Sequence, residues 1–208
     1  MKALLATAIA LMLAVRGASS QTELPSAFTD GMTRTKIEFA MPAGFTPSTI
    51  AENPHMNYEY AIQCDTSDIE IRYATRPLDK LIDSYKKSLT DSTRKMVNPD
   101  QPNSYVTIDA AVTYNISDKI ISKVSLGKEF AQRCFNADGG SLTWSTPRKE
   151  FGLDHKLCMT LCTYKYRIGL AFIFFLGDDA DVISQLAARE DVSRSFRFVE
   201  ESAKQQME

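Results

Sequence analysis

The chain has few of the residues from which catalytic sites are commonly built. Among its 208 residues it holds two histidines, His55 and His155, and a single tryptophan, Trp144. It lacks a Gly-x-Ser-x-Gly motif, which excludes the nucleophile elbow of the α/β-hydrolases. Its glycines form no phosphate-binding loop, because Gly139-Gly140 ends a predicted helix instead of opening one. The sequence therefore predicts no catalytic residue and no cofactor.

Long hydrophobic runs are missing after residue 20. The longest, Leu170 to Leu176, is far shorter than the roughly 20 residues of a membrane-spanning helix. At the start of the chain, Lys2, the apolar segment 3–15 and the small residues 18–20 form the pattern of a cleaved secretory signal. We therefore expect export to the periplasm or the exterior, cleavage near Ser20 and no membrane span in the mature chain.

Basic residues are not in excess. Once residues 1–20 are removed, 22 basic and 26 acidic side chains remain. The most basic stretch, Lys86-Lys87 followed by Arg94-Lys95, is interrupted by polar residues. Nucleic-acid binding requires clustered lysine and arginine to neutralise phosphates, so the sequence argues against a nucleic-acid partner.

The length of the mature chain fits one domain with its own hydrophobic core. We expect that domain over residues 35–200. A polar, flexible lead-in is predicted over residues 21–34, and a charged tail over residues 201–208.

Segments rich in β-branched and aromatic residues predict a mainly antiparallel sheet. They cover residues 36–42, 57–64, 69–74, 141–145, 156–166, 170–176 and 195–199. Polar turns at residues 65–68 and 167–169 predict two hairpins. The segment 170–176 is apolar on both faces and is expected in the middle of the sheet. In the segment 69–74, Glu70 and Arg72 are expected to face solvent or a cleft.

Helices are predicted from apolar spacing and from capping residues. The segment 77–89 carries an apolar stripe at helical spacing, and acidic residues at 178–181 cap a helix whose inner face includes Ile183. The segment 118–135 is predicted to be helical, with an interruption near Gly127. The segment 105–114 is ambiguous, because its β-branched residues favour a strand and Ala110-Ala111 weaken that choice. Together these elements predict an α+β fold with helices packed on the sheet.

Four cysteines, Cys64, Cys134, Cys158 and Cys162, remain in the mature chain. An even number in an exported protein is compatible with two disulfides, one disulfide or four buried thiols. A bond between Cys158 and Cys162 is excluded on a regular strand, since these positions would lie about 13 Å apart.

Two alternatives to a binding role arise from local groups of residues. One group could bind zinc or form a redox site, because histidine and cysteine serve in both: it consists of His155, Cys158 and Cys162. Strand geometry, however, separates the two thiols. Asp138, Glu150 and Asp154 lie near Trp144 in the sequence and could serve a glycoside hydrolase. The sequence favours neither a metal site nor catalysis over structural roles for these residues.

Two resemblances to known groups of proteins are visible. The element order, with the segment 39–45 (FAMPAGF) at the start and residues 183–190 leading into residues 193–198 at the end, resembles the PsbP-like α/β sandwich. That group includes a photosystem accessory protein and DcrB-like bacterial envelope proteins. The segment 135–138 before a tryptophan-containing strand also resembles small exported proteins of Gram-negative bacteria such as Bacteroidetes. Both resemblances imply an accessory or binding role.

The sequence thus indicates an exported, non-catalytic binding or assembly accessory protein. Its ligand or partner would be a small molecule or another envelope protein. Aromatic side chains with basic neighbours are enriched at binding surfaces. The candidate surface is therefore the group Trp144, Tyr164, Tyr166, Arg148 and Lys165.

Overall fold

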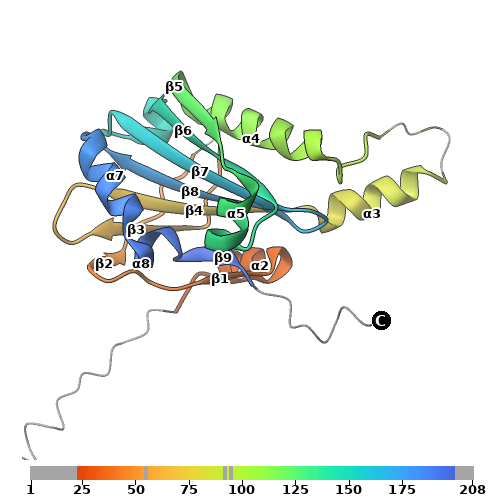
Figure 1. Cartoon of the computed structure of the whole chain (residues 1–208), viewed down its shortest axis with the longest axis horizontal. Coiled ribbons are helices and arrows are strands. Elements are labelled where there is room, and N and C mark those ends of the chain that lie inside the picture. Colours follow the sequence, from red (N-terminus) through yellow and green to blue (C-terminus); the bar gives the residue numbers. More distant parts are fainter. Residues whose placement is uncertain (1–22, 54–55, 91–92, 94–95, 200–208) are drawn as a thin grey trace, which may run out of the picture.

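A seven-stranded antiparallel sheet organises the fold, which is α+β as the sequence predicts (Figure 1). The computed structural model describes residues 23–53, 56–90, 93 and 96–199. The predicted signal over 1–20 and the tail over 201–208 lie outside the described residues. In the described part, no helix is both long and apolar enough to cross a membrane.

The strands of the main sheet follow the order β2-β3-β4-β8-β7-β6-β5. Their bounds are β2 Phe45–Pro47, β3 Tyr60–Cys64, β4 Glu70–Pro77, β5 Ser117–Ser125, β6 Gly139–Pro147, β7 Leu157–Lys165 and β8 Gly169–Gly177. Strands β1 (Ile37–Phe39) and β9 (Phe196–Phe198) form a separate two-stranded ribbon. The helices are α2 Ser26–Thr35, α3 Asp79–Ser88, α4 Pro102–Ile116, α5 Lys128–Phe135, α6 Lys149–Gly152, α7 Ala180–Ala188 and α8 Glu190–Ser193.

The predicted hairpins are confirmed, and β8 occupies the middle of the sheet. β3 pairs with β4, and β7 pairs with β8, in antiparallel register. Every residue of β8 is buried, because helices cover both faces of the sheet at this strand. Its continuous apolar sequence is the pattern expected of such a strand.

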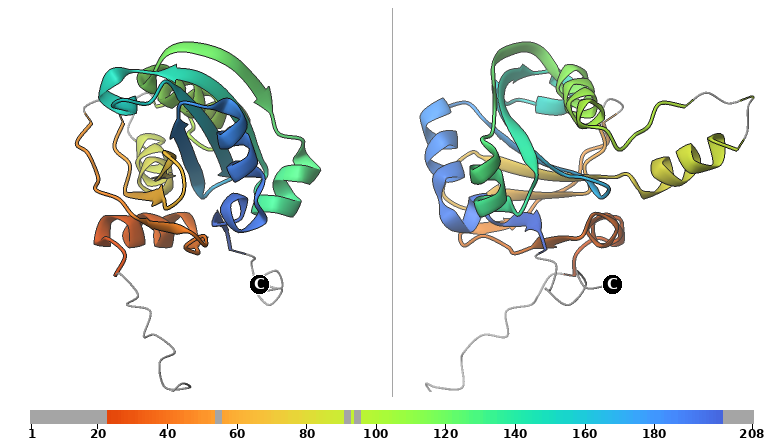
Figure 2. Two further views of the ribbon diagram at one scale, coloured as in Figure 1. Left: turned by 90° about the vertical axis from the view of Figure 1, so that its left-hand side faces the viewer. Right: turned by 45° about the vertical axis from the view of Figure 1, so that its right-hand side comes forward.

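Helices lie over both faces of the sheet (Figure 2), and a hydrophobic core lies on each face. The first core is closed by α2, α5, α7, α8 and the β1–β9 ribbon, and the second by α4, α6 and the segment before β3. The expectation that Glu70 and Arg72 face solvent or a cleft is therefore wrong. Their side chains project into the second core, where both residues are buried.

The prediction of a flexible lead-in over 21–34 is wrong from Ser26 onward, where α2 begins. Phe28 is fully buried and stacks on Tyr60 and Phe196, with ring centroids 4.9 and 5.6 Å away. Few apolar residues mark this segment, but Phe28 and the close approach of Gly31 to Thr75 hold α2 against the sheet. The domain therefore starts earlier than expected.

The segment between 105 and 135 also differs from expectation. The ambiguous segment 105–114 is part of helix α4, and the first half of the predicted helix 118–135 is strand β5. The buried face of α4 includes Asp109 and Thr113 beside Tyr105, Val112 and Ile116, so polar residues hide its helical periodicity. Two irregularities in the pairing of β5 with β6 break the alternation by which a strand is recognised.

The turn between β7 and β8 requires glycine. Gly169 has φ 155°, and a Cβ atom there would lie 2.5 Å from the carbonyl oxygen of Arg76. We expect Gly169→Ala to lower the free energy of unfolding by about 2–3 kcal/mol, measured by urea denaturation. Gly127→Ala is the control, since a Cβ meets nothing within 4 Å there. An equal loss in the two variants would contradict this reading of the turn.

Candidate functional site

The five residues predicted to form one binding surface are divided between the two faces of the sheet. Trp144 packs against the first core, whereas Tyr164 packs against the second. Trp144 pairs in register with Met159 on β7, and Tyr164 lies five residues further along that strand. An odd separation along a strand places the two side chains on opposite faces, so one surface cannot contain both.

Trp144 forms part of an apolar groove of about 320 Å³ between α5, α7 and the sheet. We call this the Trp144 groove. It is lined by Leu126, Phe130, Phe135, Leu142, Trp144, Met159, Leu161, Phe175, Ser184, Ala187, Ala188 and Ser193. This set includes no charged side chain, and its polar side-chain groups are two serine hydroxyls and the indole N–H of Trp144.

The Trp144 groove follows from the residue pattern of the elements around it. On β6, Leu142 and Trp144 alternate with Ser141, Thr143 and Ser145, so the apolar side chains share the face toward α7. On α7, the positions facing the groove are the small residues Ser184, Ala187 and Ala188, which leave space above the sheet. The sequence analysis did not predict this groove. The features that indicate it are the small residues on one side of α7 and the apolar alternation of β6, which are far apart in the sequence.

Tyr164 and Tyr166 belong to an aromatic group at the other end of β7. Their ring centroids lie 5.1 and 5.2 Å from that of Tyr105 in α4. The Tyr105 hydroxyl donates a hydrogen bond to Asp100, 3.0 Å away, and accepts one from the backbone N–H of Arg167, 2.8 Å away. Burial, together with the neighbouring Tyr166, raises the pKa of Tyr164 to about 12. This group joins α4 to the β7–β8 turn.

Arg148 and Lys165 lie at opposite ends of the β6–β7 pair. The Arg148 guanidinium lies over the ring of Tyr114, 5.8 Å from its centroid. Lys165 donates a hydrogen bond from Nζ to the carbonyl oxygen of Asn136, 3.1 Å away. Neither side chain lines the Trp144 groove.

The acidic residues considered for hydrolysis do not converge. Asp138 precedes β6 and Glu150 follows it, so the strand's nine residues separate them by roughly 30 Å. Glycosidase carboxyl groups lie about 5–9.5 Å apart. Asp138 instead accepts a hydrogen bond from the backbone N–H of Tyr166, 2.8 Å away. Glu150 and Asp154 are exposed around α6.

All four cysteines are free thiols in the structure, so neither of the possible disulfides is formed. The sheet separates them: Cys64 and Cys134 belong to the first core, and Cys158 and Cys162 to the second. Cys158 and Cys162 share one face of β7 four residues apart, the spacing for which a bond is excluded. Among the described residues, no three histidine, cysteine or acidic side chains are grouped to hold a metal ion.

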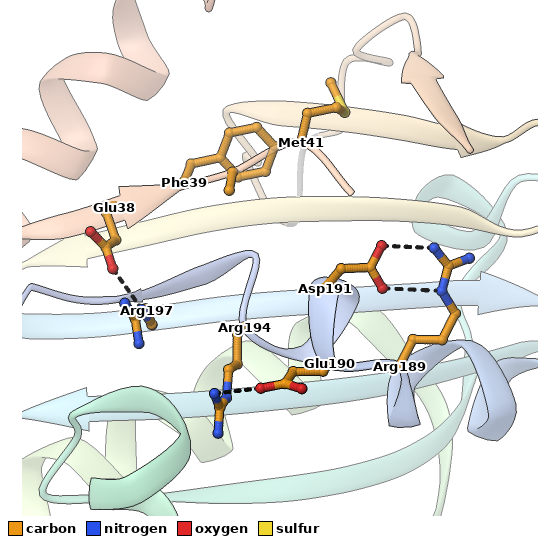
Figure 3. A pocket seen from close by; sticks show the side chains of 9 residues that line it. Glu38, Phe39, Met41, Arg189, Glu190, Asp191, Arg194 and Arg197 are labelled. Carbon is orange, nitrogen blue, oxygen red and sulfur yellow. Dashed lines mark hydrogen bonds and ion pairs between the residues drawn. The ribbon is translucent and has the colours of Figure 1, made fainter. Parts of the chain in front are cut away.

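A larger cavity, of about 850 Å³, lies between the β1–β9 ribbon and α8 (Figure 3). Three ion pairs surround it: Arg197 with Glu38 at 2.6 Å, Arg194 with Glu190 at 2.6 Å and Arg189 with Asp191 at 2.8 Å. Each arginine faces its own carboxylate, so the cavity has no charge of one sign to attract an ion. Arg189 and Asp191 also hold Ala43 by backbone hydrogen bonds, which gives this pair a structural role.

A smaller polar cavity, of about 220 Å³, lies beside α4 and was not anticipated from the sequence. At its wall, the buried Asp109 carboxylate lies 2.6 Å from Lys123 Nζ and accepts a hydrogen bond from Ser141 at 2.7 Å. Lys123 therefore pairs with the charge of this carboxylate; both contacts involve Oδ2, while Oδ1 is buried without a hydrogen-bond partner among the described residues. This arrangement fastens α4 to β5 and β6.

No family model matches the chain, and no curated protein matches it.

Proposed function

We propose that this chain is an exported, non-catalytic binding protein that holds a small apolar ligand in the Trp144 groove. The observation that carries the proposal is the lining, in which apolar side chains from β6, β7, β8, α5 and α7 surround an open space. Small-molecule sites commonly have volumes of about 300–1,000 Å³ and mostly apolar walls with few polar groups. The volume of this groove lies at the lower end of that range.

The chemistry of the lining indicates the class of ligand. A charged ligand would lose its hydration in this groove without gaining a partner, since Ser184 and Ser193 provide only neutral hydroxyls. We therefore infer an uncharged molecule or a single acyl chain. Trp144 and Phe130 supply flat aromatic surfaces for contact with such a chain.

The alternative sites support a ligand less well. The cavity by α8 is larger, but its three arginines are already paired. The acidic residues needed for glycan hydrolysis lie at separate ends of β6, and Cys158 and Cys162 are fully buried. The signal-like pattern over residues 1–20 and the resemblance to envelope accessory proteins support export and a binding role.

Fluorescence of Trp144, the only tryptophan, provides a direct test of binding. Titration with 1-decanol is expected to shift the emission to shorter wavelength and to saturate, because the alcohol displaces water from the indole. Decanoate is expected to bind more weakly, since its carboxylate finds no cation among the lining residues. No saturable response to either compound would contradict the proposal.

A matched pair of variants on α7 locates the response. Ser184 lines the groove, whereas its neighbour Gln185 is exposed and does not. We expect Ser184→Phe to fill the mouth of the groove and to weaken 1-decanol binding by about tenfold or more, which corresponds to about 1.4 kcal/mol. Gln185→Phe should leave the affinity for 1-decanol within about twofold of that of the parent chain. Equal affinity in the two variants would place the ligand elsewhere.

A further inference from the structure

The polar cavity of about 220 Å³ beside α4 is bordered by charges of both signs. Two lysines, Lys123 and Lys128, and two aspartates, Asp109 and Asp138, line it, and we call it the α4 cavity. Its volume is below the roughly 300–1,000 Å³ of sites for drug-sized ligands. It is also several times the share of about 30 Å³ that one water molecule takes in the liquid. The cavity therefore suits a small molecule.

The deeper of the two lysines is held in place by an ion pair. Lys123 Nζ lies 2.6 Å from Oδ2 of Asp109, whose side chain is only 8% exposed. The Ser141 hydroxyl donates to the same oxygen at 2.7 Å. A lysine ammonium has three N–H donors. The pair with Asp109 uses one of them, so Lys123 can also donate to an oxygen atom of a ligand in the cavity.

The other two charges have no counter-charge within the protein. In the described part of the chain, neither Lys128 nor Asp138 forms an ion pair with another side chain. Lys128 is exposed in the first turn of α5. Asp138 is half-buried, and its Oδ2 accepts a hydrogen bond from the backbone N–H of Tyr166 at 2.8 Å, which orients the carboxylate. The cavity thus presents one cation and one anion that a ligand can pair.

The rest of the wall is partly apolar. Val106 of α4 and Leu126, which follows β5, contribute aliphatic side chains, and Tyr164 contributes its ring. A Cβ at Gly139 would lie 2.3 Å from the Tyr164 hydroxyl oxygen, so glycine there lets the tyrosine lie directly against β6. A short aliphatic group could contact this part of the wall without losing favourable hydration.

We propose that the α4 cavity binds a free α-amino acid with a small aliphatic side chain. The ligand carboxylate would accept hydrogen bonds from Lys123 and Lys128, and the ligand ammonium group would donate to Asp138. A simple anion would be repelled by the aspartates and a simple cation by the lysines, whereas a zwitterion complements both. The site is separate from the Trp144 groove, although Leu126 borders both, and it does not rest on the function proposed for that groove.

Isothermal titration calorimetry of the full mature chain with L-alanine, L-valine and L-leucine tests the proposal. At least one of them is expected to bind saturably. Its N-acetyl derivative and its amide should each bind about tenfold or more weakly, because each lacks one of the two charges. No saturable heat from any of the three amino acids overturns the proposal. So does equal affinity for the free and blocked forms, or binding of D-glucose in place of the amino acids.

Two matched pairs of variants locate the site. Lys128→Gln and Asp138→Asn should each weaken amino-acid binding by about tenfold, since each removes one charged partner. The asparagine keeps an oxygen that can accept the hydrogen bond from Tyr166. The controls Lys119→Gln and Asp154→Asn alter exposed residues outside the lining and should stay within about twofold of the parent chain, because water and salt screen such charges.

The urea midpoint of each variant confirms that it remains folded. Equal losses of affinity in the cavity variants and in their controls would overturn the proposal, because the amino acid would then bind elsewhere.

Discussion

Replacing Arg72 with alanine is expected to lower the free energy of unfolding by about 3–5 kcal/mol. Arg72 is 1% exposed, in the middle of the second core. Its Nε donates a hydrogen bond to the Glu70 carboxylate, 2.6 Å away, and another nitrogen donates to the carbonyl oxygen of Phe151. Its guanidinium also lies over the rings of Tyr58 and Phe151. The alanine variant leaves the buried Glu70 carboxylate without its partner.

Urea denaturation measures this effect, and a double variant separates charge from packing. Glu70→Leu with Arg72→Met removes both charges and keeps much of the side-chain volume. We expect it to recover most of the stability lost in Arg72→Ala, because a buried ion pair often contributes little beyond an apolar pair of similar size. A loss below about 1 kcal/mol in Arg72→Ala would contradict the structural role of the guanidinium.

The second large effect is a loss of stability at alkaline pH. Burial raises the pKa of the Cys158 thiol from 9.0 to about 12, and burial with the nearby Asp109 raises that of Cys162 well above 9.0. Burial likewise raises the pKa of Tyr73 above its ordinary 10.0. All three groups are neutral when protonated, so the folded state holds these protons at a pH at which the unfolded chain releases them.

The sign of the pH dependence follows from this difference. Below about pH 9, both states bind the thiol protons and these groups do not change stability with pH. Above it, the unfolded state binds fewer protons, so the free energy of unfolding falls as pH rises. Two thiols together give a slope approaching about 3 kcal/mol per pH unit near pH 10, and Tyr73 adds to it at higher pH.

Urea denaturation across this pH range checks the expectation. The variant Cys158→Ala with Cys162→Ala should be less stable at neutral pH, because two buried side chains are shortened. Its slope between about pH 9 and pH 10 should nevertheless be much flatter than that of the parent chain. Cys134→Ala is the control, since it removes a half-buried thiol that lies outside the second core. A slope unaffected by the double variant would contradict the assignment to these thiols.

Local sequence signals predicted much of the sheet correctly. The turn residues between β3 and β4 and between β7 and β8 indicated both hairpins, and the apolar run of β8 indicated the central strand. Asp179 accepts hydrogen bonds from the backbone N–H groups of Asp181 and Val182, so the predicted cap of α7 is confirmed. These signals succeed because each depends on a few neighbouring residues.

Other segments could not be assigned in this way. In α4 the buried face contains Asp109 and Thr113. The partners of Asp109, Ser141 and Lys123, come from β6 and β5. A polar residue is recognised as buried only when the distant partner that neutralises it is known. The predicted binding surface failed for a related reason, because pairing across β6 and β7 decided that Trp144 and Tyr164 face opposite cores.

The sequence by itself determined the α+β class, the hairpins and the central position of β8, because side-chain alternation and turn chemistry are properties of adjacent residues. Only the tertiary structure decided that Arg72 is buried, that α7 and α5 leave a groove over Trp144, and that α3 projects from the body. Each of these features depends on which distant elements cover a given face. That choice results from packing across the whole sheet and is not encoded in any short segment.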